Sequence, residues 1–83
     1  EPLFEGKFSL LQQRVVGHRH LKMVLMEPLS GLAVDAIQFN ADMDIWPDES
    51  QTHVRVVYRL DVNEFRGRKT VQMLVDHLLP VNN

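Results

Sequence analysis

The feature that most constrains the fold is an alternation of apolar and polar side chains between residues 53 and 61, in which Val57 is the single exception. Successive side chains of a β-strand point to opposite faces, so this period of two predicts a strand with one buried face. The β-branched and aromatic residues in the stretch favour the same structure. The side chains expected to face inward are those of Val54, Val56, Tyr58 and Leu60.

The same period recurs elsewhere, and it predicts five strands in all. The expected strands cover residues 6–16, 20–25, 32–39, 53–61 and 70–78. In the first strand the alternation breaks at Leu10-Leu11, which predicts a β-bulge that bends the strand between two sheets. In the last strand we expect Val71, Met73 and Val75 to face inward.

Turn residues separate these strands. Pro28–Gly31 combines a fixed φ with a residue that accepts positive φ, and Asn63–Gly67 has the composition of a hairpin connection. Pro80 is expected to end the last strand. Asn40–Gln51 is polar and lacks strand alternation, which predicts a short helix, with Asn40 as its cap, or a compact loop.

Five strands with one irregular insertion after the third are typical of an all-β, five-stranded OB-type barrel. A five-stranded fragment of a β-sandwich fits the same pattern, and a simple meander order of strands would contradict the OB prediction. The 83 residues allow one domain, residues 1–83, with a modest core. We expect such a domain to have a free energy of unfolding of about 3–5 kcal/mol.

Composition excludes several classes of protein. The chain has no cysteine, so it has no disulfide and no thiolate metal ligand, which fits a reducing cytoplasm. No apolar run approaches the roughly 20 residues that cross a bilayer, and Glu1–Phe4 does not resemble a signal peptide. The chain does not begin with Met, so we expect a fragment of a longer protein.

The net charge of −2 does not by itself indicate a nucleic-acid-binding protein, but the charges are segregated. Four of the 11 acidic residues fall close together, between residues 42 and 49, whereas the cations form two groups. Such segregation predicts a surface with one attractive face. The first group is Arg14, His18, Arg19, His20 and Lys22, and the second is Arg66, Arg68 and Lys69 beside Phe65.

Both basic groups fall near loops that OB domains use for ligands, namely the turn between the first two strands and the last hairpin. Cations there suit a phosphate backbone, and Phe65 is a candidate for stacking on a base. The alternatives are a solvated turn for the first group and a Phe65 that folds back to cap the barrel. The two groups together predict one electrostatic groove.

Metal and catalytic sites are not expected. His18 and His20 lie two residues apart, but a metal site needs further ligands, and no cysteine or carboxylate pair lies nearby. Asp42, Asp44 and Asp48 do not fit a calcium loop, because Trp46 and Pro47 occupy positions that need an oxygen ligand and a glycine. Trp46 is expected to seal the barrel end or to dock on another domain, rather than to stack on a base.

Three segments resemble the OB domain of bacterial RecJ, the single-stranded-DNA-specific 5′-to-3′ exonuclease. They are Arg14–Lys22, Asp35–Asn40 and Tyr58–Gly67 with Val71-Gln72 following, and the resemblance runs from residue 6 to residue 80. It implies an OB-fold accessory domain that holds single-stranded DNA. It also implies that a DHH-type catalytic core outside this chain carries manganese or magnesium and cuts the DNA. The Asp-His-His motif of such a core is absent from this chain.

A second interpretation belongs to another functional class. OB barrels also bind peptides, so the fold alone does not settle the function. The chain is then a docking module for the catalytic core of its parent, or for the acidic tail of a single-strand-binding protein. The same basic loops suit such a tail.

Overall fold

The computed structural model describes residues 2–81, and these form five strands without a helix. The strands are β1 (Phe4–Val16), β2 (His20–Met26), β3 (Ala33–Gln38), β4 (His53–Phe65) and β5 (Arg68–Pro80). All five strands fall where the alternation predicts them. Residues 2–81 include no helix that is long and apolar enough to span a membrane.

The strands close into a barrel in the order β1-β2-β3-β5-β4. Neighbouring strands are antiparallel except for β3 and β5, which pair in parallel at three positions. This order is that of an OB barrel, so the OB prediction is confirmed. The sandwich fragment and the simple meander are excluded, because β5 lies between β3 and β4 and the sheet has no open side.

The predicted bulge in β1 is present. The register of β1 against β2 shifts between Leu10 and Gln12, so Leu11 is the extra residue. Residues 4–9 of β1 pair with β4, and residues 9–16 pair with β2. The bulge therefore bends β1 at the point where it passes from one neighbour to the other, as a small barrel requires.

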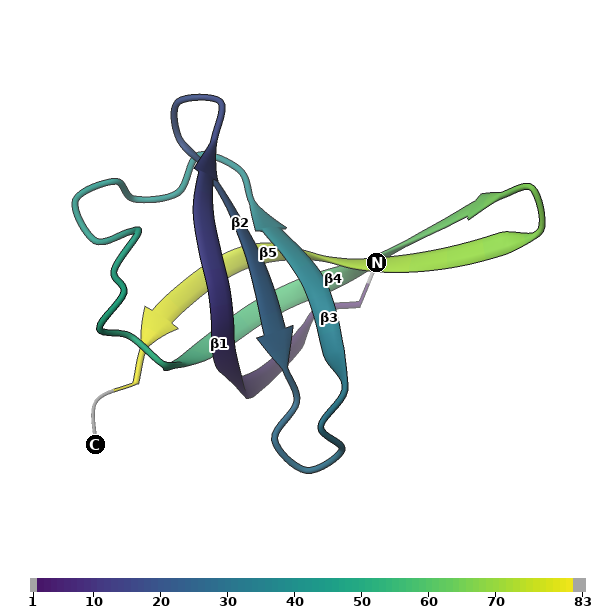
Figure 1. Cartoon of the computed structure of the whole chain (residues 1–83), viewed down its shortest axis with the longest axis horizontal. Coiled ribbons are helices and arrows are strands. Elements are labelled where there is room, and N and C mark those ends of the chain that lie inside the picture. Colours follow the sequence, from purple (N-terminus) through teal and green to yellow (C-terminus); the bar gives the residue numbers. More distant parts are fainter. Residues whose placement is uncertain (1, 82–83) are drawn as a thin grey trace.

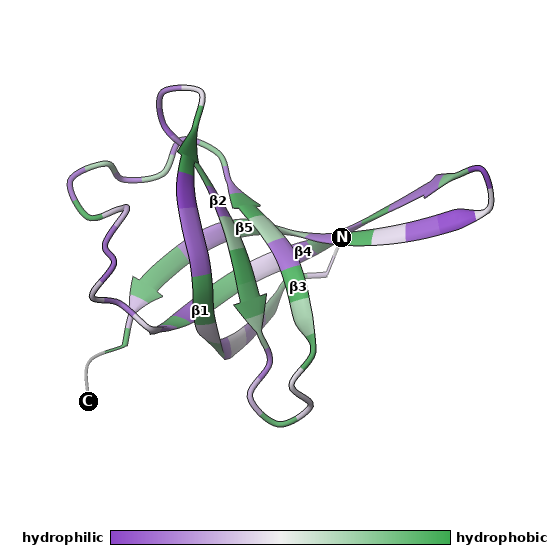
Figure 2. Cartoon of the chain, in the orientation of Figure 1, coloured by the Kyte–Doolittle hydropathy of each residue, from purple (hydrophilic) through white to green (hydrophobic). Residues whose placement is uncertain are grey.

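The core fills the barrel with alternate residues of all five strands, and Figure 2 shows the resulting apolar bands along β2 and β5. Val54, Val56, Met73 and Val75 are buried, as predicted. Trp46 is only 2% exposed, so the side chain from the β3–β4 loop seals the barrel and is not free to stack on a base. Tyr58 packs against this core with an edge-on contact to Phe8, at a centroid distance of 5.6 Å.

The prediction that Leu60 and Val71 face inward is wrong, since both side chains are 46% exposed. The reason is that β4 and β5 are longer than predicted and continue beyond the barrel as a two-stranded ribbon (Figure 1). The β4–β1 pairing stops at Tyr58, and the β5–β3 pairing involves only residues 72–74. Apolar and polar residues therefore continue to alternate along the ribbon, although no core covers its apolar face.

The last hairpin turn is shorter than the predicted Asn63–Gly67. It consists of Arg66 and Gly67 alone, with φ of 53° and 78°, while residues 63–65 still pair with β5. Two consecutive positive φ values define the type I′ turn, whose twist matches that of the strands. Gly67 suits this conformation, which a non-glycine residue such as Arg66 adopts less readily.

Residues 40–51 form a loop and no helix, so of the two predicted alternatives the compact loop is the one observed. Asn40 is not a helix cap. Its φ is 53°, and its backbone N–H donates a 3.1 Å hydrogen bond to Nδ1 of His20. Gln13 holds the far end of the loop, since its amide nitrogen donates to the carbonyl of Asp48 (2.7 Å) and its amide oxygen accepts from the Asp48 N–H (2.9 Å).

Candidate nucleic-acid interface

The strand groove is a hollow of about 430 Å³ on the outer face of β1, β2 and β3. Register explains its composition, because Arg14 is opposite Lys22 and Val24 is opposite both Gln12 and Asp35. These side chains alternate with the buried Met23 and therefore point outward. The groove is lined by Leu11, Gln12, Gln13, Arg14, Lys22, Met23, Val24, Asp35 and Glu49.

The two cations of the strand groove face each other. Arg14 and Lys22 occupy directly opposed positions on antiparallel strands, and in the described part of the chain neither has a carboxylate within ion-pair distance. Like charges directly opposite each other destabilise a sheet. An anion between the two side chains relieves this repulsion, so the pair is suited to a phosphate.

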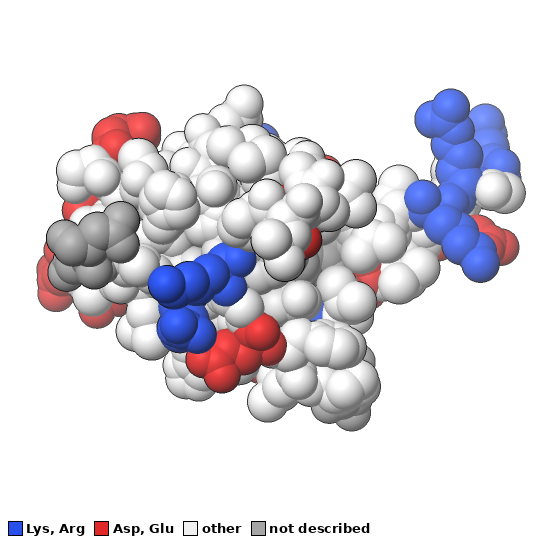
Figure 3. Space-filling model, turned by 90° about the horizontal axis from the view of Figure 1, so that it is seen from below, with Lys and Arg blue, Asp and Glu red and all other residues white. Residues whose placement is uncertain are grey.

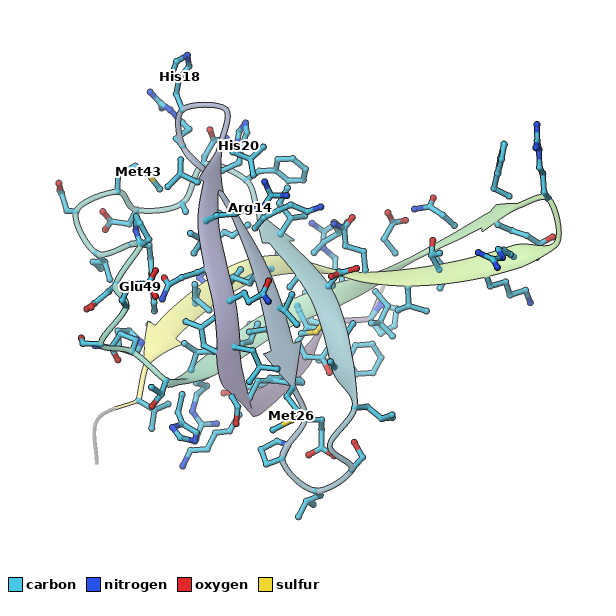
Figure 4. All side chains as sticks on the ribbon, in the orientation of Figure 1. Arg14, His18, His20, Met26, Met43 and Glu49 are labelled. Atoms are coloured by element: carbon cyan, nitrogen blue, oxygen red, sulfur yellow. The ribbon has the colours of Figure 1, made fainter. Side chains whose placement is uncertain are left out.

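Two carboxylates line the strand groove from its two flanks. Asp35 belongs to β3, and Glu49 belongs to the β3–β4 loop beside β1, where Figure 4 labels it. Hydrogen bonds within the loop fix the neighbouring Asp48. The hydroxyl and the N–H of Ser50 and the amide of Gln51 donate to its carboxylate, which lowers the pKa of Asp48. The groove therefore has its two cations on β1 and β2 and a carboxylate on each flank.

The turn hollow, of about 350 Å³, lies between the β1–β2 turn and the β3–β4 loop. It is lined by His18, Arg19, Asn40, Ala41, Asp42, Met43 and Asp44. The two aspartates stand beside the cation of Arg19, so a phosphate here meets charges of both signs. Figure 4 shows His18 at the apex of the turn, pointing away from the barrel. Of the predicted residues of the first group, His18 and Arg19 lie at this hollow rather than in the strand groove.

His20 is engaged in the fold. Its ring packs edge-on against Phe39 at a centroid distance of 5.2 Å, and its Nδ1 accepts from the Asn40 N–H. The predicted role of His20 as a DNA contact stays a prediction, with only Nε2 still available as a donor. Among residues 2–81, no group of three or more His, Asp or Glu side chains is placed to hold a metal ion.

The hairpin tip is formed by Phe65, Arg66, Arg68 and Lys69. Phe65 is 70% exposed, so the alternative in which it caps the barrel is wrong. The Arg66 guanidinium lies 5.1 Å from the centroid of the Phe65 ring, and Lys69 approaches Glu64 at 3.9 Å. Figure 3 shows the cations gathered at the end of the ribbon, away from the barrel. The tip therefore offers an exposed aromatic ring among cations.

The sequence predicts a single groove along both basic groups, and the structure places them apart. Arg14 and Lys22 share the strand groove, whereas the hairpin tip stands on a separate projection (Figure 1). Neither of the two hollows is lined by a residue of the tip. A ligand that touches both groups must span the space between barrel and ribbon.

Gln12, Asp35 and Glu49 line the strand groove, and sequence reasoning did not select them. A usable signal exists for the first two, because each is a polar residue on the outward side of an alternating strand. Which outward residues of different strands become neighbours depends on register, however. Glu49 reaches the groove through its loop, which the Gln13–Asp48 hydrogen bonds hold against β1.

Strand order and the groove over β1–β3 define the class of the domain as a five-stranded OB fold. The family model described as "RecJ OB domain" matches residues 1–77, and the chain belongs to that family.

The chain is 56% identical over 82 residues to the single-stranded-DNA-specific exonuclease RecJ of Dickeya dadantii. It is 50% identical over 82 residues to the protein of that name in Escherichia coli K12, and 43% identical over 84 residues to that of Haemophilus influenzae. These alignments cover 98–99% of this chain. The chain spans only 14–15% of the length of these relatives.

Proposed function

We propose that this domain binds single-stranded DNA and holds it for the nuclease core of a RecJ-type exonuclease. The observation that carries the proposal is the pair formed by Arg14 and Lys22, two cations opposed on one outward face with no carboxylate partner among the described residues. Such an arrangement costs stability in the free domain and favours an anionic ligand. The proposal is supported by membership of the RecJ OB domain family and by its relatives, which are named single-stranded-DNA-specific exonucleases.

The proposed binding is electrostatic and weak in the isolated domain. The strand groove contributes two cations, and the hairpin tip contributes Arg66, Arg68 and Lys69 with Phe65 as a stacking platform. A base stacked on an aromatic ring typically contributes about 1–3 kcal/mol, and each phosphate contact releases condensed counterions. His18, Arg19 and His20 add contacts at the rim of the barrel in this proposal.

The cutting itself belongs, in the same proposal, to the part of the parent protein outside this chain. A DHH-type core that holds manganese or magnesium performs the hydrolysis, and residues 1–83 supply no catalytic group. The proposed setting is the cytoplasm, where the parent acts on DNA.

The test is a fluorescence anisotropy titration with a labelled single-stranded oligonucleotide at several salt concentrations. We expect the affinity to fall as salt rises, and an Arg14→Ala/Lys22→Ala variant to bind more weakly with a salt slope shallower by about 0.7, the value for the one phosphate between these cations. An Arg66→Ala/Arg68→Ala/Lys69→Ala variant tests the hairpin tip in the same way. The matched control is Arg55→Ala, which removes a cation that is already paired with Glu5 at 3.4 Å outside the groove.

Equal affinity for the parent, the groove variant and the Arg55 control contradicts the proposed role of the groove. Absence of binding at low salt, by a domain that is shown to be folded, contradicts the function as a whole.

A second function is favoured by the ribbon. Leu60, Val62 and Val71 are 46–57% exposed on one of its faces, and Phe65 is exposed at its end. In this alternative the domain docks on the catalytic core of its parent or on the acidic tail of a single-strand-binding protein. Loss of peptide binding with unchanged DNA binding in a Phe65→Ala variant supports this docking role.

A further inference from the structure

Two rows of outward side chains cross the strands of the groove. The first row is cationic, because Arg14 on β1 is opposite Lys22 on β2. The second row is hydrogen-bonding, because Gln12 on β1 and Asp35 on β3 flank Val24 on β2. The rows are two residues apart along each strand, which corresponds to about 6.7 Å. Both rows line the same hollow.

The floor of the hydrogen-bonding row is apolar. Val24 is half-buried between the two polar side chains, and the bulged Leu11 beside it is 51% exposed. An apolar surface of this kind suits the face of a base, and none of the residues that line the groove is aromatic. Carbonyl, amide and carboxylate groups placed around such a floor give orientation and specificity to a bound ring.

Asp35 is the acid in this row. It is exposed, it lies on a strand rather than a loop, and within the described residues its carboxylate has no hydrogen bond or ion pair. An acidic side chain in a groove for a polyanion repels the phosphates. Asp35 lies in the other row, about 6.7 Å along the strands from the cationic one, so an anion between Arg14 and Lys22 leaves its carboxylate open to a different group of the same ligand.

From these two rows we infer that Asp35 accepts a hydrogen bond from the amino edge of a base whose phosphate lies between Arg14 and Lys22. This inference rests on the proposed function and adds base selectivity to it. The ionised carboxylate is only an acceptor, so it pairs with the exocyclic amino group of cytosine. Uracil presents a carbonyl oxygen at that position, and two acceptors repel each other. The expected ligand class is therefore single-stranded DNA with amino-bearing bases.

Oligodeoxycytidine and oligodeoxyuridine of about eight nucleotides, within the site sizes of OB folds, make a matched pair of probes. They carry identical sugars and phosphates and differ only in the pyrimidine edge, which separates base reading from charge. Binding is followed at low salt and pH 7.5 through the amide chemical shifts of the isotope-labelled domain, a readout that also shows whether each variant is folded. The chain is compared with Asp35→Asn and with Asp44→Asn, which removes the same charge from the turn hollow.

We expect the domain to bind the cytidine probe about three- to tenfold more tightly, which is the net contribution of one hydrogen bond of ordinary strength, as suits a solvent-exposed site. Asp35→Asn should reduce this ratio to near one while both affinities rise or stay the same. Asp44→Asn should keep the ratio. The amide shifts of Val24 and Asp35 should respond more to the cytidine probe.

Equal binding of the two probes by the parent domain, or an unchanged ratio in Asp35→Asn, overturns the inference and leaves the DNA-binding function standing. Failure of the folded parent domain to bind either probe overturns both. A ratio that changes equally in Asp35→Asn and Asp44→Asn also overturns the inference, because the effect is then one of net charge.

Discussion

The Gln13 side chain is one of the hydrogen-bonded links between the barrel and the β3–β4 loop, and its removal has a calculable effect. Its amide makes two hydrogen bonds to the backbone of Asp48, at 2.7 Å and 2.9 Å, and both are partly buried. A Gln13→Met substitution keeps the unbranched shape and removes both bonds, leaving one N–H and one carbonyl of the loop without their partner.

Each such bond contributes about 0.5–1.5 kcal/mol net, so the two together contribute about 1–3 kcal/mol. Water reaches part of this site, and we therefore expect a loss of about 1–2 kcal/mol. That is a large share of the roughly 3–5 kcal/mol expected for a domain of this size. The same loop carries Trp46, whose buried ring seals the barrel, so the loss should appear in the global unfolding transition.

Urea denaturation measures this loss through two signals, the fluorescence of Trp46 and the far-ultraviolet circular dichroism of the strands. Trp46 is the only tryptophan and is buried, so its emission reports on this loop directly. Gln12→Met is the matched control, since the neighbouring side chain is exposed and makes no hydrogen bond of this kind. We expect the control to change stability by less than about 0.5 kcal/mol. Equal midpoints for the two variants would refute the reasoning.

Two further predictions concern the same loop. Trp46→Ala should lower the free energy of unfolding by about 3–5 kcal/mol and leave the domain largely unfolded at 25 °C, whereas Trp46→Phe should stay folded. Amide chemical-shift dispersion distinguishes the two states. A cooperative unfolding transition of Trp46→Ala near that of the parent domain contradicts this prediction. Hydrogen bonds from Ser50 and Gln51 hold the pKa of Asp48 in the folded domain below its ordinary value. Ionised Asp48 therefore stabilises the domain at pH values above its ordinary pKa, and this stabilisation is lost as the pH falls through the lowered pKa of the folded state. Stability measured against pH in the acidic range should therefore fall less steeply in Asp48→Asn, and parallel curves would count against this explanation.

Local pattern was sufficient to predict the strands. Alternation located all five, and the break at Leu10-Leu11 located the bulge, because both depend only on neighbouring residues. Alternation did not predict that the ends of β4 and β5 extend beyond the barrel as a ribbon. Val71 alternates in the same way as Met73, yet only Met73 has a core to pack against. Alternation reports that a strand has an apolar face and does not report what covers that face.

The candidate site divides in a similar way. Cations are visible in the sequence as two groups, and the structure confirms that Arg14 and Lys22 are neighbours. The separation of the hairpin tip from the strand groove depends on how far β4 and β5 extend beyond the barrel. The neighbourhood of Gln12, Val24 and Asp35 depends on the register of three strands, which no single segment specifies.

The ribbon also has two unpaired backbone edges, which matter for self-association. Among the described residues, β4 has no partner on its outer side beyond Tyr58, and β5 has none on its outer side before Gln72. An edge with exposed valines invites another chain to add a strand, and charged side chains oppose such addition. Glu64, Arg66, Arg68 and Lys69 stand at this edge. The charges proposed to grip DNA thus also keep copies of the domain from pairing through their ribbons, so neutralising the tip should lower solubility as well as affinity.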